Sequence, residues 1–168
     1  MVEKEVVYSS KTKIKGIFSF EEYYKFCYKW LTEDLGLDVM ETKYSEKIVG
    51  ESKNIEVKWL GTRDVTDYFK FEVNVDFMVI GLKKAEIINE GVKIETNTGS
   101  VETKVKGTLA MDYKGKFEKD AFRKFLRGIY EKWVVPSLID QQKVKLIEDC
   151  DEFLNQGKAF LDLEAKKG

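Results

Sequence analysis

One stretch, residues 68–79, limits most strongly what this chain can fold into. Every odd position from Phe69 to Val79 carries an apolar side chain, and the even positions are polar until Met78. Successive side chains of a β-strand point to opposite faces of the sheet, so strict alternation predicts one long strand with a buried face and a solvated face. The apolar face of such a strand needs a second layer of structure to cover it.

Weaker alternation recurs before and after this strand. We expect further strands at about residues 6–18, 40–48, 55–59, 84–88, 92–94 and 101–111. Gly81 and the run Asn97-Thr98-Gly99 are turn signals, and we expect them to separate neighbouring strands. Helical periodicity is missing between the second strand and the last one, which indicates an antiparallel sheet of about six to seven strands joined by hairpins.

A helix is expected after the first strand. Ser19 and Glu22 form a capping box, which predicts a helix over residues 20–35 that Gly36 ends. Three aromatic side chains fall outside its inward-facing stripe and indicate an additional contact surface: Phe26, Tyr28 and Trp30.

The apolar period changes to 3.6 after the last strand. It predicts a helix over residues 122–134. Pro136 must kink or break the long helix, because proline lacks an N–H and clashes with the preceding turn. A second helical segment follows over residues 137–155. We expect Gly157 to end it and residues 158–168 to form a flexible tail.

The order of these elements is strand, helix, about six antiparallel strands and a long C-terminal helix. Over residues 6–154 this order resembles the helix-grip fold of the START-type and SRPBCC superfamily. The resemblance implies one α+β domain, residues 1–157, in which a curved antiparallel sheet grips a long, Pro-kinked C-terminal helix. The family often has two short helices between its first two strands, where we expect a single one. The segments at residues 20–26 and 122–130 are also similar to those of an uncharacterised archaeal protein family, a resemblance that implies no function.

Charge balance and missing residue types restrict the function. The chain carries 29 basic and 30 acidic side chains, which argues against a general nucleic-acid binder, since such proteins usually carry a basic excess. The 168 residues include no histidine, so a Ser-His-Asp or Cys-His mechanism within this chain is excluded. The motifs G-x-G-x-x-G, Walker A and C-x-x-C do not occur. The sequence therefore favours a protein without catalytic residues, cofactor or metal. An enzyme is the third alternative, and without histidine its acid–base work would fall to Glu46, Tyr44 or a lysine.

The N-terminal segment and the cysteines indicate a cellular location. The N-terminal segment has no apolar stretch of the signal-peptide kind, and no apolar run approaches the roughly 20 residues of a membrane span. We therefore expect a cytoplasmic protein in which Cys27 and Cys150 are free, buried thiols. Abundant Lys and Glu favour a heat-adapted source, whereas a single proline argues against it.

The helix-grip resemblance implies a largely apolar pocket between the sheet and the C-terminal helix. Its lining would come from Trp59, Phe71, Val73, Val75, Phe77, Val105, Leu109, Met111, Phe125, Ile129 and Trp133, with Tyr44 and Glu46 as polar candidates. A non-catalytic binding module would hold an apolar small molecule or lipid there, in a void of several hundred Å³. The alternative is an interaction or assembly protein whose core is filled by these side chains, and which acts through its surface and its C-terminal helix.

Glu46 and a group of lysines are the notable polar features. Glu46 lies in phase with Tyr44, so alternation aims a carboxylate inward, where burial would raise its pKa; a bulge would instead turn it to water. If the first and last strands pair, as the resemblance implies, five lysines gather on the solvated face: Lys11, Lys13, Lys15, Lys104 and Lys106. They would attract RNA, an acidic partner or a membrane surface, or they simply protect a solvated face against edge pairing.

Two glycines stand where glycine is unfavourable. Gly107 lies on the apolar face of a strand and Gly128 inside a helix, and a close approach of helix and sheet would account for both. We therefore expect Gly128→Leu to disrupt packing. Five acidic residues have a spacing that matches no calcium or magnesium loop, so they predict no metal site: Asp64, Asp67, Glu72, Asp76 and Asp112.

Overall fold

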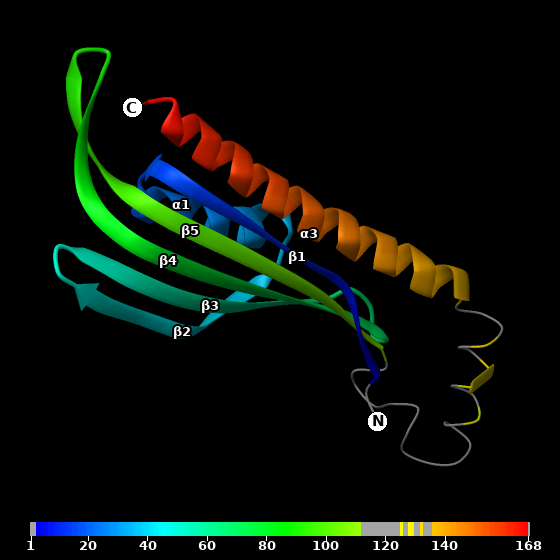
Figure 1. Ribbon diagram of the computed structural model, residues 1–168. Coiled ribbons are helices and arrows are strands. Elements are labelled where there is room, and N and C mark those ends of the chain that lie inside the picture. Colours follow the sequence, from blue (N-terminus) through cyan, green and yellow to red (C-terminus); the bar gives the residue numbers. More distant parts are fainter. Residues whose placement is uncertain (1–2, 112–124, 126–127, 130–131, 133–135, 168) are drawn as a thin grey trace.

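The computed structural model of the chain describes residues 3–111, 125, 128–129, 132 and 136–167. Its elements in chain order are β1 (Glu3–Phe18), α1 (Phe20–Lys29), the π-helical segment η1 (Trp30–Asp34), β2 (Asp38–Val49), β3 (Ser52–Asp64), β4 (Phe69–Asn89), β5 (Val92–Met111) and α3 (Pro136–Ala165). The described strands form one five-stranded antiparallel sheet with the order β1-β5-β4-β3-β2 (Figure 1). The predicted α+β class and antiparallel sheet are confirmed.

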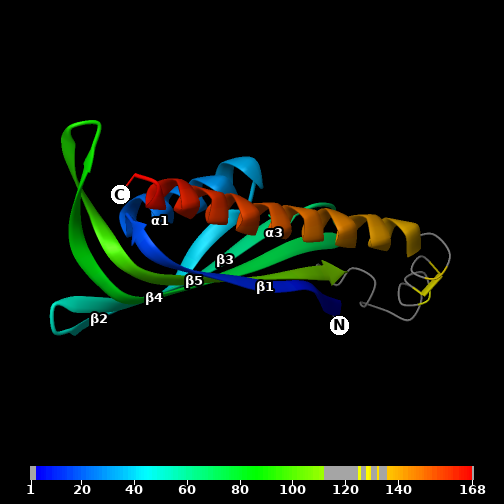
Figure 2. The ribbon, with the colours of Figure 1, turned by 45° about the horizontal axis from the view of Figure 1, so that its top comes forward.

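The sheet is curved, and both helices lie on its concave face (Figure 2). α3 crosses β1 and β5. α1 covers β3 and β4, where Tyr23 meets Phe77 and Tyr24 meets Trp59 edge to face, with ring centroids 5.7 and 5.0 Å apart. The odd-numbered residues of β4 from Phe69 to Val79 are buried under these helices, as the alternation predicts. The concave face is therefore the buried one, and the convex face is solvated.

The prediction of six to seven strands is wrong, because two long strands bend without ending. β4 continues past Gly81, and β5 runs unbroken through residues 97–99. Gly81 has a φ of +67°, and the pairing of β4 with β5 shifts register between Ile80 and Lys83. A bulge at a glycine in the left-handed region bends a strand while pairing continues on both sides. The β4–β5 arm, residues 82–98, consequently curls toward the helices (Figures 1 and 2).

The predicted start and end of the first helical stretch are confirmed. Ser19 is the N-cap of α1, and its Oγ accepts a hydrogen bond of 3.3 Å from the N–H of Glu22. The helical path continues through η1 as far as Leu35. Gly36 follows with a φ of +66°, the left-handed conformation that commonly stands after a helix end.

α3 is longer than the sequence predicts. The helix passes through Gly157 and ends at Ala165, so Gly157 does not terminate it. A Cβ at this position would lie 3.1 Å from the hydroxyl oxygen of Tyr23, so glycine here permits the close approach of α3 to α1. Leu161, in the segment expected to be a flexible tail, is helical and buried.

Aromatic residues on α1 and at the start of η1 make contacts inside the molecule. The ring of Phe26 stacks on Phe160 of α3 with a centroid distance of 4.6 Å, and Trp30 lies beside it at 6.3 Å. Tyr28 meets Trp59 edge to face at 5.8 Å. The additional contact surface inferred from these aromatic residues is therefore used largely within the fold, with α3 as one partner.

Pro136 is the first residue of α3. Proline is well tolerated at this position, because the missing N–H would have no partner in the first helical turn. The helix predicted over residues 122–134 and the kink next to Pro136 lie largely outside the described residues. Among the described helices, none combines the length and the apolar character that crossing a membrane requires.

α3 packs closely on β5 at Gly107. A Cβ built on Gly107 would lie 2.9 Å from Cys150 Sγ and 3.3 Å from Leu146 Cγ. This confirms the close approach of helix and sheet predicted at Gly107. The corresponding prediction for Gly128 is wrong, because a Cβ there meets no described atom within 4 Å.

Both cysteines are free and buried, as predicted. Burial raises the pKa of the Cys150 thiol to about 12 and the pKa of the Cys27 thiol well above its usual range. Reactivity requires the thiolate, so these thiols are chemically inert in the folded protein.

Candidate functional site

Most side chains predicted to line an internal pocket form the core itself. Eight of them are buried: Trp59, Phe71, Val73, Val75, Phe77, Val105, Leu109 and Met111. Helix side chains fill the space above them, including Tyr23, Leu146 and Phe153, each only 1% exposed. All of these residues belong to one continuous cluster. Apart from Trp59, none of the eight lines the depressions described below.

Three other predicted pocket residues have different positions. Phe125 is 63% exposed and Ile129 is 39% exposed, so the prediction that they face an interior pocket is wrong. Trp133 lies outside the described residues.

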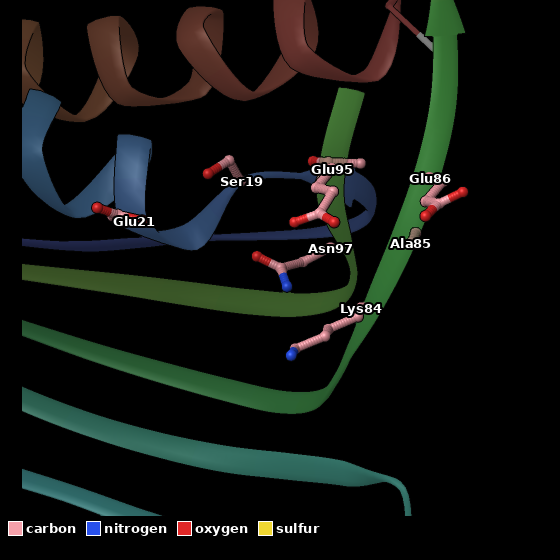
Figure 3. Close-up of a pocket in the computed structure, with 8 residues that line it drawn as sticks. Ser19, Glu21, Lys84, Ala85, Glu86, Glu95 and Asn97 are labelled. Carbon is pink, nitrogen blue, oxygen red and sulfur yellow. The ribbon is translucent and has the colours of Figure 1, made fainter. Parts of the chain in front are cut away.

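An open groove lies on the concave side, beneath the β4–β5 arm. It consists of three adjoining depressions of about 490, 470 and 310 Å³, which share Asn97. The largest contains Ser19, Glu21 and Lys84 in its wall (Figure 3). The third is lined by Phe20, Glu21, Tyr24, Tyr44, Glu46, Lys53, Ile55, Leu82 and Asn97. We call the three together the concave-end groove.

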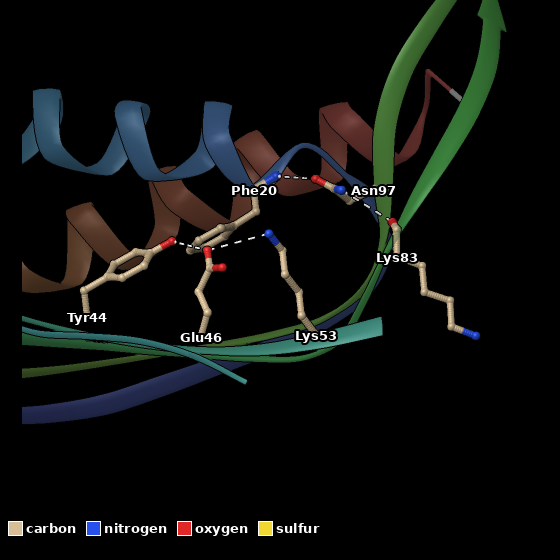
Figure 4. Close-up of polar contacts among 6 residues, drawn as sticks. All are labelled: Phe20, Tyr44, Glu46, Lys53, Lys83 and Asn97. Carbon is tan, nitrogen blue, oxygen red and sulfur yellow. Dashed lines mark hydrogen bonds and ion pairs between the residues drawn. The ribbon is translucent and has the colours of Figure 1, made fainter. Parts of the chain in front are cut away.

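Asn97 ties the walls of the groove together. Its Oδ1 accepts a hydrogen bond of 3.2 Å from the N–H of Phe20 at the start of α1, and its Nδ2 donates to the carbonyl of Lys83 at 3.4 Å (Figure 4). On the other side, the N–H of Gly81 donates to Asn54 Oδ1 on β3 at 3.0 Å. The bent arm is thus anchored to α1 and to β3, which holds the groove open between them.

Tyr44 and Glu46 lie at the open edge of this groove and not in the core. Tyr44 pairs with Val57 and Glu46 with Ile55, and directly opposed residues share a face of the sheet. Because Val57 and Ile55 are buried on the concave face, Glu46 also points to that face, as alternation predicts. β2 is the last strand of the sheet, so the Glu46 side chain remains 38% exposed. Of the two alternatives for Glu46, burial or contact with water, the structure shows contact with water, which results from the edge position of β2 and not from a bulge at Glu46.

The polar contacts of Glu46 keep it ionised. The hydroxyl of Tyr44 donates a hydrogen bond of 2.7 Å to Glu46 Oε1, and the Lys53 ammonium lies 3.6 Å from the same atom (Figure 4). The Tyr44 hydrogen bond, helped by Lys53, lowers the pKa of Glu46, whereas burial would have raised it. Burial and the Glu46 hydrogen bond raise the pKa of Tyr44 to about 12.

A second carboxylate on β2 is held in the same way. A bulge between Glu41 and Lys43 shifts the register and brings Glu41 to the concave face opposite Trp59. Glu41 Oε1 accepts hydrogen bonds from the Tyr24 hydroxyl at 2.7 Å and from Trp59 Nε1 at 3.1 Å. Two carboxylates therefore stand on the concave face of the edge strand, each oriented by a tyrosine.

The floor of the groove is apolar, and one buried hydroxyl lies in its wall. Phe20, Ile55 and Leu82 are buried and also line the third depression. Thr96 lines the largest depression, and its Oγ1 is buried without a hydrogen-bond partner among the described residues. Buried hydroxyls are almost always hydrogen-bonded, so this oxygen is suited to a bound polar group.

The predicted lysine group is present on the convex face. β1 pairs with β5, as the resemblance implied, and places Lys11 directly opposite Lys104. All five lysines are exposed, and none has an ion-pair partner among the described residues. Glu102 lies opposite Lys13, and Asp76 lies opposite Lys104 on β4, so acidic side chains interrupt the positive charge. The depression beside Lys104 and Lys106 measures about 200 Å³, less than any of the three that form the groove.

Acidic residues do not gather into a metal site in the described part of the chain. There, no three of the residues His, Cys, Asp and Glu come close enough together to hold a metal ion. Glu72 instead forms an ion pair with Lys4 at 3.1 Å. Asp112 lies outside the described residues.

Sequence reasoning missed the residues that build the groove. In the sequence, Asn97 looks like a turn residue, Leu82 like the residue after a strand end, and Phe20 like part of an inward helical stripe. The available signal was Gly81, which marks a bulge as readily as a strand end. The two interpretations place Leu82 and Asn97 differently, and only the continuous arm brings them to α1.

Comparisons with models of protein families, with curated proteins and with solved structures find no match to this chain.

Proposed function

We propose that the protein is a non-catalytic binding module whose ligand, a small and partly apolar molecule, lies in the concave-end groove. One observation carries the proposal. The buried apolar side chains of Phe20, Ile55 and Leu82 form the floor of an open depression of about 310 Å³, a volume typical of a ligand site. The buried hydroxyl of Thr96 in the adjoining depression, without a partner in the described part of the chain, adds a polar anchor.

This proposal moves the ligand away from the position that the resemblance implied. Between the sheet and α3 the side chains fill one another's space, with Leu146 and Cys150 seated on Gly107. A ligand there would have to displace close-packed side chains, each worth several kcal/mol of stability. A ligand in the groove displaces only water.

We also propose that the chain adopts a helix-grip-like fold. The order β1-α1-β2 to β5-α3, the curved antiparallel sheet and the C-terminal helix on the concave face support it. One departure is the length of two strands. The described residues form five strands, and β4 and β5 continue beyond the body of the sheet as the bent arm. α1 lies next to α3, and its side chains occupy the space where a central pocket would otherwise be.

The experiment that tests the proposed function compares two single variants. A neutral apolar probe, 1-hexanol, is titrated into the protein and its binding followed by ligand-observed NMR. Tyr44→Ala removes an exposed ring from the groove wall and should weaken binding about five- to tenfold. Met78→Ala removes an exposed apolar side chain from β4 outside the groove and should leave binding unchanged. Equal binding by both variants and the wild type would contradict the proposal.

A second candidate function is self-assembly through β2. This strand is an edge of the sheet and exposes Met40, Ile48 and Val49. Exposed apolar edge strands are templates for pairing with another strand. If β2 forms such a contact, sedimentation analysis should find a dimer that the double variant Met40→Lys/Val49→Lys converts to a monomer. A wild-type protein that stays monomeric at about 100 µM would contradict this candidate.

We further propose that the protein works in the cytoplasm. The supporting observation is that Cys27 and Cys150 are both free, as expected in a reducing compartment.

A further inference from the structure

Three aromatic rings and two carboxylates surround one depression of the concave-end groove. Phe20 and Tyr24 come from α1 and Tyr44 from β2, and all three line the depression of about 310 Å³. Phe20 and Tyr24 meet edge to face with centroids 6.2 Å apart. Figure 4 shows Tyr44, Glu46 and Lys53 extending from the sheet toward Phe20. Ring faces carry negative electrostatic potential, so rings grouped in this way attract a cation.

Without Lys53, the side chains that line this depression would carry a net negative charge. The lining contains the carboxylates of Glu21 and Glu46, and Lys53 is its basic residue. Glu21 is already paired with Lys25 of α1 at 2.9 Å, so Glu46 is the carboxylate that a bound cation would meet. Glu41 lies beside this depression and accepts a hydrogen bond from the Tyr24 hydroxyl. Glu46 is oriented by the Tyr44 hydroxyl, which contacts one oxygen and leaves the second available to the depression. Carboxylates next to ring faces bind an organic cation without requiring it to donate hydrogen bonds.

Lys53 shows where such a cation would lie. Its ammonium is 3.6 Å from Glu46 Oε1, and both side chains are about two-fifths exposed. An exposed ion pair at this distance contributes little to stability and exchanges readily with solvent. An incoming cation can therefore replace the Lys53 ammonium beside Glu46 while the lysine extends into water.

We infer that the concave-end groove recognises an organic ammonium group, with the apolar part of the ligand on the floor formed by Phe20, Ile55 and Leu82. The inference rests on the proposed function, because it names the chemical class of ligand for the same groove. Lys53 is then a competitor of the ligand and not one of its partners. If the ligand instead had an anionic head group, Lys53 would be its partner, because the ammonium would bind that group directly.

Three probes with one tail separate the inference from the proposed function. Hexyltrimethylammonium, 1-hexanol and hexanoate are titrated into the full chain, and affinities are taken from amide chemical shifts. The inference predicts that the ammonium binds about tenfold more tightly than the alcohol and that hexanoate binds most weakly. Equal binding of all three would keep the proposed function and overturn the inference, as would tightest binding of hexanoate. Absence of binding by all three would overturn both.

Variants of exposed residues give a second readout. Glu46→Gln should weaken binding of hexyltrimethylammonium about tenfold and leave 1-hexanol unaffected. Lys53→Met should strengthen ammonium binding about two- to fivefold, because the competing cation is gone. Lys47→Met is the matched control, since Lys47 lies on the same hairpin opposite Asn54 and faces away from the groove; it should change nothing. Weaker ammonium binding by Lys53→Met than by Lys47→Met would overturn the inference.

Discussion

Replacing Gly107 by alanine tests how closely α3 packs on the sheet. The added Cβ would lie 2.9 Å from Cys150 Sγ and 3.3 Å from Leu146 Cγ, so these side chains, or the helix that carries them, must shift. Overpacking of this kind costs about 1–3 kcal/mol. Alanine in a strand regains about 0.5–1 kcal/mol, because it restricts the unfolded chain more than glycine does. The net loss in free energy of unfolding should be about 1–2 kcal/mol, which lowers Tm by about 2–8 °C in a chain of this size.

A double-mutant cycle shows whether the clash with Cys150 is the cause. Cys150→Ala removes the sulfur and should by itself cost about 1 kcal/mol. In the double variant Gly107→Ala/Cys150→Ala, the new methyl group occupies the space left by the sulfur, so the two changes should compensate. We expect a coupling free energy of about 1–3 kcal/mol from urea unfolding of all four proteins. Additive losses would show that Cys150 is not the cause, and a Gly107→Ala variant as stable as the wild type would contradict the close packing of α3 on β5.

Four further predictions follow from individual contacts. Gly157→Ala places a Cβ 3.1 Å from the Tyr23 hydroxyl and disturbs its 2.7 Å hydrogen bond with Thr103. This costs about 1–3 kcal/mol and outweighs the roughly 0.5–1 kcal/mol that alanine regains over glycine in a helix, so urea unfolding should show a net loss of about 1 kcal/mol. Gly128→Ala, with no described atom within 4 Å, should not destabilise the protein. Gly81→Val puts a β-branched residue at a φ of +67° and should cost about 1–2 kcal/mol in the same assay, so an unchanged stability would speak against the bulge. Ellman's reagent at pH 8 should label neither Cys27 nor Cys150 until urea is added, because burial raises both thiol pKa values, and rapid labelling of the native protein would be inconsistent with this packing. Because the pKa of Glu46 lies below its usual 4.5, ammonium binding in the groove should stay constant from about pH 8 to about pH 5 and decline only as the pH falls through that lowered value; a decline that begins near neutral pH would point to another group.

Patterns that depend on neighbouring residues predicted the local structure well. Three such predictions are confirmed: the alternation in β4, the Ser19 cap and the Gly36 helix end. Each depends on residues that lie close together in the sequence. Each requires only one backbone conformation, so short-range patterns suffice. The position of Gly107 under α3 was also accessible, because a glycine on the apolar face of a strand often marks the close approach of another segment.

Features that depend on distant partners could not be predicted in this way. Gly81 is compatible with a strand end or with a bulge, and its pairing with β5 decides between them. Gly157 looks like a helix terminator, yet it is the close contact with Tyr23 that requires a glycine. Asn97 reaches Phe20 across 77 residues of sequence. The candidate groove is built from such contacts, so the sequence located the carboxylate and tyrosine on β2 but not the site that they line.

Methyl NMR with 1-hexanol as the probe distinguishes a ligand in the groove from a ligand in the core, because methyl groups report separately on the two. A ligand in the concave-end groove should produce chemical-shift changes at Ile48, Ile55 and Leu82, which line the groove. Changes centred instead on Val73, Val105 and Leu109, which are buried beneath the helices, would place the ligand in the core and overturn the proposed function.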